Sequence, residues 1–150
     1  MNDLIQEYKR TFLTKKKKQQ YFKDSIEHFK NTYNTIKDEI NDDTYDDIYY
    51  KNIMENQLIE VKFKFLLFNS ILKNDKENIK ENFNKFNLCN LETIDFYEEL
   101  NNNNDDITFI YIENGIKTKG GVEYLRLCNQ KKVEYEFFIY VIEDYNKIKL

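Results

Sequence analysis

Residues 58–72 read LIEVKFKFLLFNSIL, and this stretch decides the fold. Apolar side chains recur in it at intervals of three and four residues, the spacing of one face of an α-helix: Leu58, Val61, Phe65, Phe68 and Leu72. Further apolar residues widen this stripe: Ile59, Phe63, Leu66 and Leu67. The alternation in VKFKF resembles a strand, but the length of the surrounding pattern favours a helix. Such a wide stripe predicts the central, most buried helix of the protein.

A second apolar seam with the same spacing lies upstream: Phe22, Ile26, Phe29, Tyr33, Ile36 and Ile40. Extended backward, the seam reaches Ile5 and is interrupted by two polar positions, Lys15 and Gln19. The pattern predicts either one long helix with a solvated middle or two helices broken near residues 15–19. We expect the next helix to begin after Thr44, which forms a capping-box pattern with Asp47.

Downstream of the central helix, Asp75 is expected to cap a shorter helix, and Asn90 a fourth short one. From Ile107 the apolar period changes toward that of strands. The strand candidates are 107–112, Val122–Cys128 and Val133–Ile142, with a hairpin turn at Asn114-Gly115. The sequence therefore predicts a single α+β domain over residues 1–150. In it, an N-terminal layer of three to four helices (about 1–100) precedes a C-terminal antiparallel sheet of three to four strands (about 107–143).

The composition points to the genome and the compartment. Among 150 residues there is no Ala, Pro or Trp, whereas Asn, Lys, Ile, Phe and Tyr, all with AT-rich codons, are abundant. This bias indicates an AT-rich genome. The two cysteines, Cys89 and Cys128, form no CxxC motif, which favours a reducing compartment. Neither a signal-peptide core nor an apolar run of about 20 residues is present, so we expect a cytoplasmic protein without a membrane span.

Catalytic and metal-binding patterns are weak. The single histidine, His28, lies three residues from Ser25 with no acid obviously placed to orient its ring. One histidine and two distant cysteines support no zinc site. The only glycine pair, Gly120-Gly121, lacks the residues of a phosphate-binding loop. We therefore expect a non-enzymatic protein that uses no metal or cofactor.

Charge is distributed unevenly along the chain. Residues 88–114 contain seven carboxylates and no Lys or Arg, and they also contain aromatic residues. An acidic face with aromatic anchors attracts and then holds a basic partner. The candidate partner-binding residues are Glu92, Asp95, Glu98, Glu99, Asp105 and Asp106, with Asp42, Asp43, Asp46 and Asp47 as a second acidic group. The resulting hypothesis is an inhibitor of the toxin-immunity or phage anti-defence type, which occludes a basic surface of a nuclease or another nucleic-acid-handling protein.

Two alternatives stay open. A nucleic-acid-binding module would use the basic residues near the N-terminus, although no aromatic platform accompanies them: Lys9, Arg10, Lys15, Lys16, Lys17 and Lys18. A self-associating structural protein would use the seam of residues 22–40 as a coiled-coil-like interface. The sequence leaves the oligomeric state open.

Overall fold

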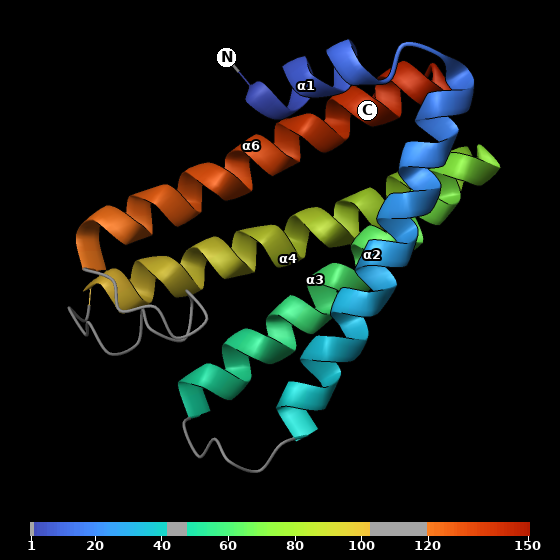
Figure 1. Ribbon diagram of the computed structural model, residues 1–150. Helices are drawn as coiled ribbons and strands as arrows, with labels where there is room; N and C mark the ends of the chain where they lie inside the picture. The colour runs from blue at the N-terminus through green and yellow to red at the C-terminus, as the bar shows by residue number, and fades with distance from the viewer. Residues whose placement is uncertain (1, 42–47, 103–119) are drawn as a thin grey trace.

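A computed structural model describes residues 2–41, 48–102 and 120–150 of the chain (Figure 1). Nearly all of these residues are helical, and none of them forms a strand. The helices are α1 (Asp3–Thr11), α2 (Lys15–Asn41), α3 (Ile48–Lys73), α4 (Lys76–Asn102) and α6 (Gly120–Asn146).

The four long helices reverse direction from one to the next (Figure 1). Helix α3 lies between α2 and α4 and packs extensively against both. Helix α6 packs along α4 and also touches α3, while the short α1 lies on α6. The prediction of a central helix from residues 58–72 is therefore confirmed.

The N-terminal seam is divided between two helices. The Asn2 side chain caps α1 by accepting hydrogen bonds from the backbone N–H groups of Leu4 and Ile5, at 3.1 and 3.3 Å. The hydroxyl of Thr14 accepts from the N–H of Lys17 at 3.2 Å at the start of α2. The break thus lies at residues 12–14, just before the expected position, and the two-helix alternative is the correct one.

The turn between α3 and α4 contains no glycine, and the polar residues Asn74 and Asp75 form it instead. Asn74 adopts the left-handed conformation, with φ of 52°, which asparagine tolerates better than most residues. The N–H of Asp75 reaches back to the carbonyl of Ser70 at 3.1 Å and closes the end of α3. The carboxylate of Asp75 then accepts from the N–H of Asn78 at 3.2 Å and caps α4, as the sequence predicted.

The core is aromatic and centres on Phe68 of α3, which has no exposed surface. Its ring centroid lies 5.4 Å from that of Phe22, 5.0 Å from that of Phe29 and 5.2 Å from that of Phe138. One side chain therefore joins α2, α3 and α6. Phe86 of α4 completes the cluster with its centroid 4.8 Å from that of Phe138.

The predicted C-terminal sheet is wrong. The strand candidates Val122–Cys128 and Val133–Ile142 both lie within the single helix α6. Their β-branched and aromatic residues favour strands locally, but packing decides the outcome. The buried residues of the second candidate follow helical spacing: Phe137, Phe138, Val141 and Ile142. The candidate strand 107–112 and the Asn114-Gly115 turn lie outside the described residues.

Asn90 does not cap a short helix, because α4 runs without interruption from Lys76 to Asn102. The Asn90 side chain is buried in the middle of α4 instead. Its amide donates to the backbone carbonyl of Lys131 in α6 at 3.2 Å. A residue type that is typical of helix starts therefore joins two helices here.

Four buried or half-buried charges also connect α3 and α6: Glu60 and Lys64 of α3, and Lys131 and Glu134 of α6. The Nζ atom of Lys131 lies 2.8 Å from a carboxylate oxygen of Glu60, and that of Lys64 lies 2.9 Å from Glu134. Burial alone would raise the pKa of Glu60, but Lys64 and Lys131 outweigh it and hold the pKa below its usual value. Burial would likewise lower the pKa of Lys131, but Glu60 and Glu134 raise it. We call these residues the charge quartet.

Breaking the quartet should destabilise the fold more than replacing one pair completely. Glu60→Leu leaves the Lys131 ammonium buried without its main partner, and we expect the free energy of unfolding to fall by about 3–5 kcal/mol. The double variant Glu60→Leu/Lys131→Met should recover most of this loss in urea denaturation. A double variant as unstable as the single one would contradict this account.

The quartet also predicts a pH window for stability. Because the pKa of Glu60 is lowered by folding, its contribution is complete above about pH 5 and is lost as acid protonates the carboxylate. Because the pKa of Lys131 is raised, its contribution is lost only in strong alkali, above about pH 10. The urea midpoint should change less with pH at the acid end of this range in Glu60→Leu/Lys131→Met than in the wild-type chain.

Removing the Phe68 ring should be among the most destabilising single truncations. Phe68→Ala leaves a cavity where three helices meet, and we expect a loss of about 3–5 kcal/mol in the free energy of unfolding. The matched control is Leu13→Ala, since Leu13 is 72% exposed and should change the value by less than about 0.5 kcal/mol. Similar losses in both variants would argue against this core.

Candidate functional site

Three of the predicted acidic residues lie together on the solvent-facing side of α4. Glu92, Asp95 and Glu98 are exposed and follow one another at intervals of three residues, within two helical turns. None of them forms an ion pair with any residue in the described ranges. Their negative charge is therefore not neutralised by the lysines of those ranges.

The other acidic candidates are only partly located. Glu99 belongs to α4, but its side chain is not described. Asp42, Asp43, Asp46 and Asp47, like Asp105 and Asp106, lie outside the described residues. For these positions, the single acidic face stays a prediction from the sequence.

Two exposed leucines adjoin the three acids, and the sequence analysis did not single them out. Leu88 is 61% exposed and Leu91 is 49% exposed. They lie one to two turns before Asp95 on the same side of α4. We call Leu88, Leu91, Glu92, Asp95 and Glu98 the acidic stripe. One signal in the sequence could have revealed the stripe. With the spacing of an α-helix, the two leucines fall on the opposite face from the inward residues Ile79, Phe83 and Phe86.

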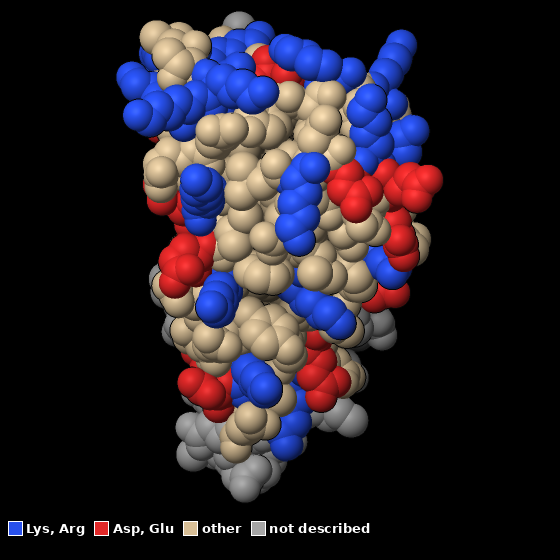
Figure 2. Space-filling view, turned by 90° about the vertical axis from the view of Figure 1, so that its right-hand side faces the viewer, with Lys and Arg blue, Asp and Glu red and all other residues tan. Residues whose placement is uncertain are grey.

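The basic candidates near the N-terminus occupy α1 and the first turn of α2. Lys9 and Arg10 are exposed on α1, and Lys15, Lys16 and Lys17 are exposed on α2. Lys9 lies over the ring of Tyr140, with its Nζ atom 5.1 Å from the centroid. Exposed lysines on both helices thus contribute to a basic end of the molecule, seen at the top of Figure 2.

Lys18 differs from its three lysine neighbours because it forms an ion pair with another helix and is only partly exposed. Its Nζ atom lies 2.7 Å from the carboxylate of Asp144 in α6. The same ammonium lies 5.9 Å from the centroid of Tyr8, a residue that is almost fully buried. Lys18 is thus a link between α2 and α6 as well as a candidate for binding.

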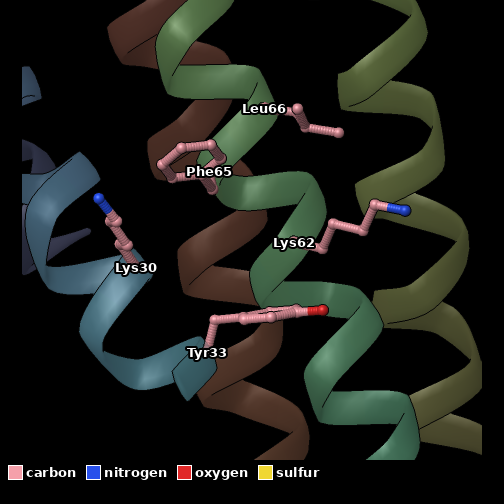
Figure 3. Close-up of a pocket in the computed structure, with 5 residues that line it drawn as sticks. All are labelled: Lys30, Tyr33, Lys62, Phe65 and Leu66. Carbon is pink, nitrogen blue, oxygen red and sulfur yellow. The ribbon is translucent and has the colours of Figure 1, made fainter. Parts of the chain in front are cut away.

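A lysine-flanked groove lies between α2 and α3, and sequence reasoning missed it (Figure 3). Lys30 and Tyr33 come from α2, while Lys62, Phe65 and Leu66 come from α3. The hollow measures about 260 Å³. In Figure 3 Phe65 points from α3 toward α2 and Lys30, whereas Lys62 and Leu66 extend from α3 toward α4. We call this hollow the α2–α3 groove.

The residues around the α2–α3 groove are mostly basic or uncharged. In Figure 2, which faces this side of the bundle, lysines border a broad uncharged area and most carboxylates lie toward its margins. One signal in the sequence could have revealed it. Lys23, Lys30 and Lys37 recur every seven residues, which places them on one side of α2.

The histidine and serine of the sequence analysis line another hollow, together with Asp24 and Glu134. His28 and Ser25 make no hydrogen bond to each other, and Glu134 is engaged with Lys64. Ser25 forms a hydrogen bond with the Tyr21 side chain instead, which lowers the pKa of the phenol. Burial has the larger effect and raises that pKa to about 12. The hollow therefore lacks the hydrogen-bonded relay that a nucleophilic serine requires.

The remaining reactive groups are enclosed. Cys89 and Cys128 are both buried and form no disulfide bond. Burial, with the nearby carboxylates of Glu92 and Glu60, raises the pKa of the Cys89 thiol, which keeps it protonated and unreactive. Within the described ranges, no group of three or more His, Cys, Asp or Glu side chains is placed to hold a metal ion.

Comparison with known proteins gives no family assignment. No protein-family model matches the chain, and neither the curated proteins nor the solved structures give a significant match. Among the helices described, none has a segment of sufficient length and hydropathy to cross a lipid bilayer.

Proposed function

We propose that this chain is a non-enzymatic inhibitor that binds a basic surface of a nucleic-acid-handling protein through the acidic stripe, in the manner of toxin-immunity or phage anti-defence proteins. The observation that carries the proposal is the juxtaposition, on one helix face, of exposed leucines and carboxylates that form no ion pair within the described residues. Isolated exposed leucines are common on protein surfaces. Two of them beside three acids combine apolar surface that can be buried on contact with charge that can steer a basic partner.

Each part of the acidic stripe has its own role in binding. Glu92, Asp95 and Glu98 attract a basic partner over a distance comparable to the Debye length and so raise the association rate. Leu88 and Leu91 lose their exposed apolar surface on contact and so slow dissociation. A helix presents both groups rigidly, which limits the conformational entropy lost on binding.

The experiment is capture from a nuclease-treated lysate of the source cells, with the wild-type chain and a charge-reversed variant compared. Glu92→Lys/Asp95→Lys/Glu98→Lys should lose a basic, nucleic-acid-handling protein that the wild-type chain retains, with at least about a tenfold loss of affinity in 100 mM salt. The purified partner should lose its activity on nucleic acid when the wild-type chain is added, and should keep it with the variant.

The matched control is Glu7→Lys/Glu27→Lys/Glu39→Lys, which changes the net charge by the same amount on α1 and α2. This control should capture the partner as the wild-type chain does, and Leu88→Ala/Leu91→Ala should release the partner faster. The proposal fails if the charge-reversed variant captures and inhibits the same protein as well as the wild-type chain does.

A further inference from the structure

The lysines around the α2–α3 groove form two rows. Lys23, Lys30 and Lys37 are exposed on α2 and are separated by about 10 Å along the helix axis. Lys62 and Lys73 are exposed on α3 and lie about three turns apart on one side of that helix. Lys62 lines the α2–α3 groove, whereas Lys73 lines the hollow between α3 and α4. None of these five ammonium groups pairs with a carboxylate of the described residues. The α2 row therefore carries positive charge over several turns, and Lys62 adds a further charge from α3.

Aromatic rings lie between the rows. Tyr33 and Phe65 are half-buried in the α2–α3 groove, and neither ring stacks on another aromatic ring in the part of the chain that the structure describes. In Figure 3 the Tyr33 ring reaches from α2 toward α3, while Phe65 points toward α2. The rings in the core differ, because Phe22, Phe68 and Phe138 each contact other rings. The two groove rings thus keep surface that can accept a flat partner.

This combination favours one kind of ligand. Proteins hold single strands with repeated cations beside accessible aromatic rings, and the phosphates contact the cations while the bases stack on the rings. A duplex keeps its bases stacked inside and is too wide to bring them to a hollow between two neighbouring helices. An acidic peptide would satisfy the lysines, but it would give the two rings no base to stack on.

We infer that the α2–α3 groove binds single-stranded nucleic acid, with Lys30 and Lys62 contacting phosphates and Tyr33 and Phe65 contacting bases. The inference goes beyond the proposed inhibition, because it uses different helices and does not depend on the acidic stripe. The two rows lead toward the basic end that contains Lys15–Lys17, so a strand longer than the groove continues over positive surface.

The test is fluorescence anisotropy of a labelled dT20 strand with the full chain at 50 and 200 mM NaCl. The wild-type chain should bind dT20 more tightly than a duplex of equal length. Lys30→Glu/Lys62→Glu should weaken binding at least about tenfold and should make the slope of log K against log[salt] shallower by about 1.4, roughly 0.7 per lost phosphate contact. Tyr33→Leu should weaken binding at least about fivefold and leave the slope unchanged, because it removes stacking but no charge.

The control Lys80→Glu/Lys132→Glu makes the same change in net charge on α4 and α6, away from both the groove and the basic end, and should bind dT20 within about twofold of the wild-type chain. Circular dichroism of each variant confirms that it is folded. The inference is overturned if wild-type protein does not bind dT20 at 50 mM NaCl, or if the control loses as much affinity as the groove variant. It is equally overturned if Tyr33→Leu has no effect, or if polyglutamate of matched length competes as well as unlabelled dT20.

Discussion

Helix α3 carries apolar side chains around most of its circumference, and that surface must be covered on more than one side. Leu67, Phe68 and Ile71 have no exposed surface at all. Helices α2 and α4 cover its two flanks, and α6 contributes Phe138 to the aromatic core. What remains outside is the side bearing Lys62, Phe65 and Leu66. The demand for burial therefore also determines which part of α3 is left to form the α2–α3 groove.

The helical part of the fold was predictable because its apolar residues keep one period over several turns. The seam of Phe22 to Ile40 and the stripe around Phe68 both correspond to observed helices. The C-terminal third was not predictable, because β-branched and aromatic residues there resemble strands. Lys131 and Glu134 also look like solvent-facing residues when read alone. Their partners in α3 are distant in the sequence, and pairing across helices cannot be read from spacing.

The two candidate surfaces also differ in whether they come from one segment or from two segments that are distant in the sequence. The carboxylates of the acidic stripe lie in one segment, so the sequence alone could place Glu92, Asp95 and Glu98 close together on the surface. The α2–α3 groove is formed by two helices, so Lys30 and Lys62 line the same hollow only after α2 and α3 have packed together. Asn90 gives a third example, because a residue that favours helix ends locally is used as a cross-helix hydrogen-bond donor. Local preference predicts an element, whereas the tertiary environment determines what each side chain does.

The charge quartet has a consequence for how the bundle reaches a unique arrangement. Its signs alternate along both helices, so Glu60 opposes Lys131 and Lys64 opposes Glu134 in one alignment only. A slip of α6 by a single turn would bring Glu60 toward Glu134 and leave two like charges in an apolar interior. Apolar surfaces alone would tolerate such a shift along the helix axis, because one apolar side chain can often take the place of another of similar size. The quartet thus favours one alignment of α6 along α3 over the alignments shifted by one turn. This selection acts on a helix whose own residues would also suit a sheet.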